Sequence, residues 1–212
     1  MIHLESVTMT HALGGTAQKT VLKPTTITLP TDRKLVVLGP DLLAKSAFMR
    51  LLAGIEAPPQ GRIRLGVRLS PVIKYLALFH PRLSFLENVD FVANLLNVSP
   101  GDLALLLEAS GYSDLSRSES QQHSEREHRI AAEVALLTLL PFDCYLADEI
   151  GHFPEAIRAQ LFDSIDKRKV GIIFACAQPR LARQYADCAI VMRDGLVYPF
   201  PNVEEALSFH GR

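Results

Sequence analysis

Lys45 and Ser46 are a lysine and a hydroxyl residue placed where they could hold phosphates. They close the segment GPDLLAKS, residues 39–46, which matches the frame G-x-x-x-x-G-K-S apart from Ala44 at the last glycine. In this frame, backbone N–H groups and a helix N-terminus bind phosphates, the lysine reaches the terminal phosphates, and the serine binds Mg²⁺. The sequence therefore predicts nucleotide-binding residues at Gly39, Ala44, Lys45 and Ser46, with Ser46 also a metal ligand.

The same segment departs from the backbone requirements of the frame. Ala44 carries a Cβ where glycine is usual, and such a residue costs about 1–2 kcal/mol in a left-handed conformation. Leu42 and Leu43 are larger departures, because they place bulky side chains in the loop. The alternative interpretation is an ordinary strand–loop–helix connection in which Lys45 is a solvated surface residue.

Asp148 and Glu149 are the second pair of residues that could do chemistry. They follow the apolar stretch 142–147, so a strand would deliver both acids at its carboxyl end, where ligands bind in open α/β sheets. Asp148 could hold Mg²⁺ through water, and Glu149 could act as general base toward an attacking water. The alternative is that both acids are solvated or cap a helix, as acids at strand ends often do.

The surrounding patterns predict an α/β fold that positions both pairs. Short apolar runs are typical of parallel strands covered on both faces, and they occur at 34–38, 142–147 and 170–177. The N-terminal segments 2–8 and 20–29 predict antiparallel strands, with Gly14-Gly15 at a turn. The remaining predicted elements are helices at 44–53 and 155–167, a hairpin at 189–198 and a last helix from Val203.

The middle of the chain changes to a helical pattern. Apolar spacing predicts two short helices between Ser84 and Gly111, separated by a break at Ser99-Pro100-Gly101. The segment 116–129 is crowded with polar and charged residues, and we interpret it as a surface loop or as the entry to the next helix. The apolar helix predicted over 130–142 is shorter than the roughly 18 apolar residues of a membrane span.

Composition excludes several classes of protein. The 212 residues, 48% of them hydrophobic, can bury a sizeable core. The 22 Lys and Arg against 23 Asp and Glu leave a net charge of −1, which argues against binding to nucleic acid. Cys144, Cys176 and Cys188 are an odd number of cysteines in apolar surroundings, which is typical of buried thiols in a reducing compartment. Because the N-terminus also lacks a secretory signal pattern, we expect a cytosolic protein.

The motifs resemble those of ABC-type ATPases, and specifically the ATP-binding subunits of capsular and cell-surface polysaccharide exporters. The resemblance runs along nearly the whole chain. Besides the two polar pairs, it is carried by the segments 1–8, 51–55, 61–63, 79–80, 86–89, 91–92, 193–195 and 203–206. It implies one ABC-type nucleotide-binding domain over residues 1–212, with a RecA-like phosphate-loop core, an antiparallel β part and a small helical subdomain over approximately 84–135.

The resemblance also implies partners and cofactors. The helical subdomain would dock on a membrane permease subunit of a polysaccharide exporter. Two ATP-binding domains would enclose two ATP molecules with Mg²⁺, as a homodimer or as a heterodimer with an active paralogue. Such a protein would be cytoplasmic and peripheral on the inner face of the cell membrane.

Four further positions depart from the motifs of the family. His11 stands where an adenine-stacking aromatic residue is expected, and His80 is the nearest polar residue to the glutamine that senses the γ-phosphate. Counting back from Asp148 places the signature loop at 124–128 (SEREH), whose glutamates would repel a phosphate that glycine N–H groups would bind. Gln178 follows a predicted strand at the position where the family has its switch histidine, and it can hydrogen-bond but cannot carry a charge or shuttle a proton. Alternatively, Gln178 simply ends a strand, because the proline after it can start a helix.

Three hypotheses follow. The first, which we favour, is an ABC-type protein of a surface polysaccharide export system that has largely lost ATP hydrolysis and acts as a structural or regulatory partner. The second is an active exporter ATPase with divergent loops, in which Glu149 is the base and Lys45 the phosphate clamp. The third is a binding module that has exchanged nucleotide for another ligand or a protein contact through the polar segment 116–129. ATP and Mg²⁺ are the expected cofactors if nucleotide binding is retained.

Overall fold

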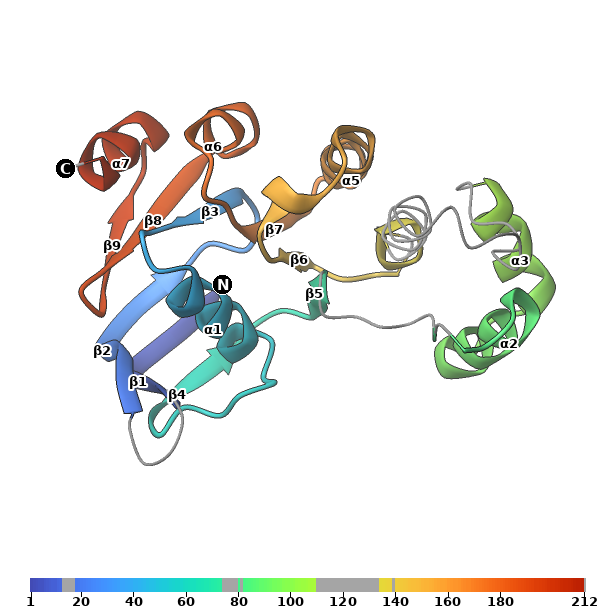
Figure 1. Cartoon of the computed structure of the whole chain (residues 1–212), viewed down its shortest axis with the longest axis horizontal. Coiled ribbons are helices and arrows are strands. Elements are labelled where there is room, and N and C mark those ends of the chain that lie inside the picture. The colour runs from blue at the N-terminus through green and yellow to red at the C-terminus, as the bar shows by residue number, and fades with distance from the viewer. Residues whose placement is uncertain (13–17, 74–79, 81, 110–133, 139, 212) are drawn as a thin grey trace. The chain divides into compact units, whose positions relative to one another are not determined.

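The chain forms two compact units, which are described separately. The computed structural model describes residues 1–12, 18–73, 80, 82–109, 134–138 and 140–211. The first unit comprises Met1–Val72, Phe142–His152 and Ile165–Arg212, and the second comprises Ile73–Pro141 and Phe153–Ser164 (Figure 1).

The first unit contains a three-stranded sheet of β1 (Ile2–Ala12), β2 (Gln18–Leu29) and β4 (Gln60–Leu65) in the order β2-β1-β4. β1 pairs antiparallel with both of its neighbours, so the predicted antiparallel part is confirmed. Both N-terminal strands are longer than predicted. The expected turn at Gly14-Gly15 lies outside the described residues.

A six-stranded sheet forms the other layer of this unit, in the order β5-β6-β7-β3-β8-β9. Its strands are β3 (Lys34–Leu38), β5 (Leu69–Ile73), β6 (Cys144–Ala147), β7 (Gly171–Ala175), β8 (Cys188–Arg193) and β9 (Leu196–Phe200). β3 pairs parallel with β7 and β8, β6 pairs parallel with β7, and β9 returns antiparallel on β8. Every residue of β6 and β7 is buried, which explains their unbroken apolar sequences.

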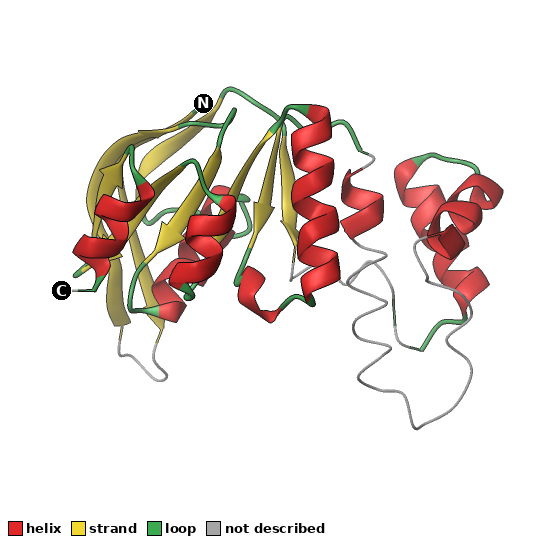
Figure 2. Cartoon of the chain, turned by 90° about the horizontal axis from the view of Figure 1, so that it is seen from above, coloured by secondary structure: helices red, strands yellow, loops and turns green. Residues whose placement is uncertain are grey.

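α1 (Leu42–Leu52) shares one hydrophobic core with both sheets. Leu4 of β1, Leu22 of β2, Val37 of β3 and Phe48 of α1 are all fully buried in this core. On the opposite face of the six-stranded sheet lie α6 (Pro179–Tyr185) and α7 (Val203–His210) (Figure 1 and Figure 2). The sheet is therefore covered on both faces, and α1 is held at the centre of the unit.

The second unit is helical where it is described. α2 (Phe85–Leu96) begins with a capping box between Ser84 and Glu87 and ends at Asn97, whose φ of 54° is left-handed. α3 (Pro100–Ala109) begins at the proline of the predicted break, so the break lies at 97–99, two residues earlier than predicted. A proline is compatible with a first helical turn because its missing N–H is not needed there.

The remaining helical segments are placed as follows. α5 (Glu155–Arg168) confirms the helix predicted over 155–167. Of the apolar helix predicted over 130–142, residues 134–138 are described and are helical, whereas 140–142 are described and are not helical, so the predicted end was too late. The polar segment 116–129 lies outside the described residues. Among the described helices, none is long and apolar enough to cross a membrane.

Candidate functional site

The candidate site lies where β3 and β6 end. Both strands run parallel to β7, so their carboxyl ends meet at the same edge of the sheet. β3 continues through Gly39 into α1, and β6 continues into Asp148 and Glu149. A Cβ on Gly39 would lie 2.5 Å from the carbonyl oxygen of Met192, so glycine is needed for the chain to pass β8 at this point.

Lys45, Ser46, Asp148 and Glu149 form a buried polar cluster at this edge. The hydroxyl of Ser46 donates a hydrogen bond to Oδ2 of Asp148 at 2.7 Å. Nζ of Lys45 lies 2.9 Å from Oε1 of Glu149 and donates to the carbonyl oxygen of Cys176 at 3.2 Å. The structure thus brings together the two residue pairs that stand far apart in the sequence.

Burial excludes a solvated surface position for these residues. Lys45 and Asp148 are 0% exposed, Glu149 is 2% exposed and Ser46 is 7% exposed. The hypothesis that Lys45 is a solvated surface residue is therefore wrong, because its ammonium group lies inside the protein. The acids are not solvated either, and Glu149 neutralises Lys45 at contact distance.

Glu149 also has an unusual backbone conformation. Its φ of 49° is left-handed, which is rare for a residue with a Cβ and costs about 1–3 kcal/mol. The left-handed turn follows β6 directly and leads into a short 3₁₀ turn, Ile150–His152. Strained backbone of this kind occurs often at functional sites, where the surrounding structure holds a side chain in a required place.

The first turn of α1 differs from the predicted phosphate loop. α1 begins at Leu42, two residues before the helix predicted from Ala44, so half of the expected loop is helical. The N–H of Ala44 donates to Oδ1 of Asp41 at 3.1 Å, and the N–H of Lys45 donates to the carbonyl oxygen of Asp41 at 3.2 Å. The physical reason is that leucine is a good helix former and aspartate a good N-cap, whereas glycine would favour an open loop.

Asp41 is the residue at this site that the sequence interpretation missed. Its Oδ2 also pairs with Nζ of Lys19, from the start of β2. The hydrogen bond from Lys19, followed by those from the N–H groups of Ala44 and Leu43, lowers the pKa of the Asp41 carboxyl below its usual value. A signal was present in the sequence, because an aspartate directly before a helical pattern is a strong N-cap candidate.

The residues present fit the two expected cofactors unequally. The Ser46 hydroxyl and the Asp148 carboxylate lie side by side, and both are oxygen ligands of the kind that Mg²⁺ takes. The phosphate position at the N-terminus of α1 does not fit a second anion, because the Asp41 carboxylate already accepts its N–H groups. In this arrangement a phosphate would have to displace Asp41.

Gln178 lies close to the backbone that follows Glu149. It is the N-cap residue of α6, and its side chain makes no capping hydrogen bond. A Cβ on Gly151 would lie 1.9 Å from Oε1 of Gln178, so this glycine leaves the space that the Gln178 side chain fills. The alternative interpretation of Gln178 also agrees with the structure, since β7 ends at Ala175 and α6 begins at Pro179.

The other predicted site residues are described only in part. His11 lies in β1 opposite Lys19 of β2, and its side chain is outside the described part. His80 belongs to the second unit, where its N–H donates to Oδ1 of Asn88 at 2.6 Å. The predicted signature loop, 124–128, lies outside the described residues.

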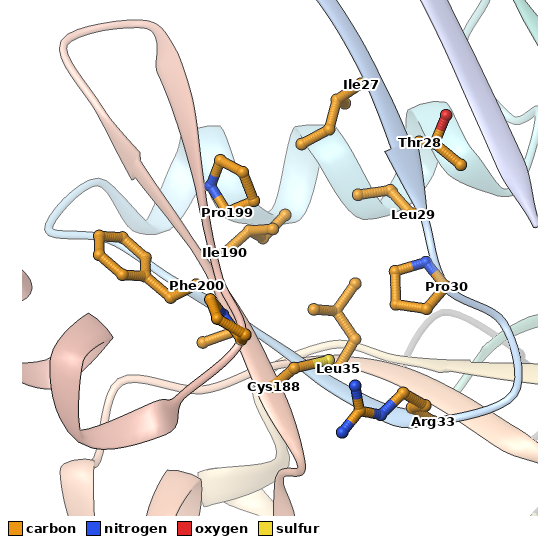
Figure 3. A pocket seen from close by; sticks show the side chains of 12 residues that line it. Ile27, Thr28, Leu29, Pro30, Arg33, Leu35, Cys188, Ile190, Pro199 and Phe200 are labelled. Atoms are coloured by element: carbon orange, nitrogen blue, oxygen red, sulfur yellow. The ribbon is translucent and has the colours of Figure 1, made fainter.

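A cavity of about 250 Å³ lies at the other edge of the six-stranded sheet (Figure 3). Its lining includes Leu35 and Cys188, which lie where β3 and β8 begin, together with Ile190 and Pro199. The buried polar cluster, in contrast, lies where β3 ends. In Figure 3 the guanidinium of Arg33 points toward Cys188. Burial raises the pKa of the Cys188 thiol, so this cysteine stays protonated at neutral pH. None of the predicted site residues lines this cavity.

Comparison with known proteins supports the fold and relates the chain to ATP-binding proteins of transporters. No protein-family model matches the chain. The chain is 28% identical over 199 residues to the ATP-binding protein BexA of Haemophilus influenzae, covering 91% of this chain and 90% of that protein. It is 25% identical over 217 residues to the capsule polysaccharide export ATP-binding protein CtrD of Neisseria meningitidis, covering 99% and 98%. It is 27% identical over 218 residues to the polysialic acid transport ATP-binding protein KpsT of Escherichia coli, covering 98% and 97%.

The chain is similar along nearly its whole length to ABC-transporter ATP-binding proteins, and its fold is that of ABC ATPase domains. Solved structures agree with this fold. A dimeric, post-hydrolysis form of the ATP-binding cassette MJ0796, bound to ADP and Pi, matches with a TM-score of 0.70 at 16% identity and covers 94% of this chain and 98% of that one. Against the phosphate-loop frame, the chain has the lysine and the serine at positions 45 and 46, and it has leucine and alanine at positions 42 and 44.

Proposed function

We propose that the chain is an ABC-type ATP-binding-subunit protein of capsular or cell-surface polysaccharide export in which ATP hydrolysis is weak or lost. It would act as a structural or regulatory partner within the exporter. The export system is inferred from the relatives named for capsule polysaccharide export and polysialic acid transport. The observation that supports weak hydrolysis is the pairing of the two key charges with each other, since the buried Lys45 ammonium contacts Glu149.

The magnitude of this pairing explains why it would weaken nucleotide binding. The Lys45–Glu149 ion pair must break before Lys45 can bind phosphates and before Glu149 can activate water. Breaking a buried ion pair costs about 3–5 kcal/mol. The contacts of a nucleotide must first offset this cost of about 3–5 kcal/mol. The cost is about as large as the whole binding free energy at a dissociation constant of ~1 mM, which is about 4 kcal/mol.

The proposed partners are a membrane permease subunit and a second ATP-binding subunit, either a second copy or an active paralogue. The permease contact would be made by the helical subdomain, which we place over approximately 84–135. α2 and α3 expose large apolar side chains, at Leu86, Phe91, Leu95 and Leu105, and these support a protein contact on that subdomain. The protein would then lie on the cytoplasmic face of the membrane, attached through the permease.

An active ATPase is the second candidate function, and one observation favours it. Ser46 and Asp148 remain 2.7 Å apart, with Glu149 next in the chain, so the oxygen ligands and the base expected for Mg²⁺-dependent hydrolysis are present. In that case the Lys45–Glu149 pair would open when nucleotide binds. The two candidates differ in what the purified protein does with ATP.

The test is turnover of radiolabelled ATP by the purified chain with Mg²⁺, together with calorimetry at millimolar nucleotide. We expect no release of phosphate above background and little or no heat of binding. Turnover at the rates of ordinary ABC ATPases, abolished in the Lys45→Ala variant, would contradict the proposal. The same assays repeated with a co-purified exporter permease check whether the partner activates the site.

A further inference from the structure

We propose that Asp41 is an internal anion that occupies the phosphate position at the N-terminus of α1 and so keeps nucleotide phosphates out. This inference rests on the proposed function, because it names the contact that would close the nucleotide site. It also explains the poor fit of the site to a phosphate chain, since the anion position is already filled by the protein itself.

The geometry of α1 places this carboxylate where a phosphate would bind. The free N–H groups of a first helical turn and the partial positive charge of a helix N-terminus together attract an anion. The N–H of Ala44 points to Oδ1 of Asp41, and the N–H of Lys45 to the Asp41 carbonyl oxygen. Both N–H groups belong to the segment 39–46, whose frame predicts that they face phosphates.

Lys19 completes the contact from another element. Its ammonium group pairs with Oδ2 of Asp41, so the carboxylate is held between β2 and α1. The pair is partly solvated, with 49% of the Lys19 side chain and 31% of the Asp41 side chain exposed. A partly solvated pair of this kind contributes little to stability, and its charge matters mainly for which anions can approach.

Leu42 and Leu43 lie in the first turn of α1, where they are 46% and 53% exposed. Their effect that the structure shows is on the backbone of this segment. They extend the helix, and the helix presents its N–H groups to the Asp41 carboxylate.

The variant Asp41→Asn tests the inference in the full-length chain. Asparagine has the same shape and caps helices about as well as aspartate, so α1 should keep its first turn. The probes are inorganic tripolyphosphate and Mg-ATP, measured by isothermal titration calorimetry. We expect a dissociation constant for tripolyphosphate at least about tenfold lower in the variant than in the natural chain, because a negative charge in contact with the phosphate position is removed.

Asp32→Asn is the matched control, because it changes the net charge by the same amount at the opposite edge of the sheet. Asp32 is exposed and lies just before β3, whereas Asp41 follows the end of that strand. We expect no gain of phosphate binding in this variant. An equal gain in both variants would overturn the inference, since net charge alone would then explain it.

The outcomes separate this inference from the proposed function. If the natural chain already binds Mg-ATP tightly and hydrolyses it, the proposed function fails. If neither the natural chain nor Asp41→Asn binds either probe, while circular dichroism shows both folded, Asp41 is not the obstacle and only the inference fails. Asp41→Ser, which keeps a capping oxygen without the charge, serves as the second variant should Asp41→Asn fail to fold.

Discussion

The first turn of α1 leads directly to Lys45 and Ser46 of the buried polar cluster, but the two regions differ in how far they are buried. In the cluster, Lys45 and Glu149 are almost completely buried and neutralise each other. In the first turn, residues 41–43 are at least partly exposed, and their polar contacts are shared with water. The cluster keeps the residue types of an ABC nucleotide site, and the first turn does not.

The difference teaches which residues report on function. A buried charge that loses its partner costs several kcal/mol of folding stability. The need for a stable fold is therefore enough to explain why both Lys45 and Glu149 are present. Their presence is therefore weak support for catalysis. An exposed first turn carries no such penalty, so Asp41, Leu42 and Leu43 could replace the loop residues without loss of the fold. The exposed residues, and not the buried acids, are therefore the positions to vary when nucleotide binding is tested.

The largest effect is expected from breaking the buried pair. Glu149→Leu leaves the Lys45 ammonium buried without its carboxylate, and we expect the free energy of unfolding to fall by about 3–5 kcal/mol. Urea denaturation followed by circular dichroism measures this loss. The double variant Lys45→Met/Glu149→Leu replaces both charges with apolar groups and should recover most of the stability. If the free energy of unfolding of Glu149→Leu falls by less than about 1 kcal/mol, the loss is no larger than that of one hydrogen bond. That result would show that the pair is not needed for stability.

A smaller effect is expected at the helix cap. Asp41→Ala removes the acceptor for the Ala44 N–H, and we expect a loss of about 1 kcal/mol at neutral pH. Because the folded pKa of Asp41 lies below its usual value of 3.8, the stabilisation is present above that value and is lost as pH falls through the folded pKa. The two denaturation curves should therefore converge in acid. Equal differences at pH 7 and in strong acid would mean that the Asp41 charge contributes nothing.

The smallest effect is expected at the exposed leucines. Leu43→Ala removes a side chain that is 53% exposed from the first turn and replaces it with the best helix former, so we expect a change within about 0.5 kcal/mol. Leu51→Ala in the same helix is the buried control, 1% exposed, with an expected loss of about 2–5 kcal/mol. Thermal unfolding of the two variants side by side checks the contrast. A large loss at Leu43 would place the first turn under the same packing constraint as the buried cluster.

Most of the elements could be predicted from local patterns. The apolar runs that became β3, β6 and β7, and the helical spacing of α2 and α5, are signals carried by neighbouring residues. Predictions were least accurate at the start of α1. There a loop frame and a helix signal overlapped, and the leucines and the aspartate cap favoured the helix.

The sequence by itself determined the order of strands and helices and the residue types available at the ends of β3 and β6. Only the tertiary structure decided the partners of those residues. Ser46 bonds to Asp148 across 102 positions, Lys45 bonds to the Cys176 carbonyl across 131, and Lys19 reaches Asp41 across 22. Periodicity and capping are properties of adjacent residues, whereas charge pairing depends on where distant strands end in space. The sequence therefore contains the charges of a nucleotide site, and folding pairs them with one another.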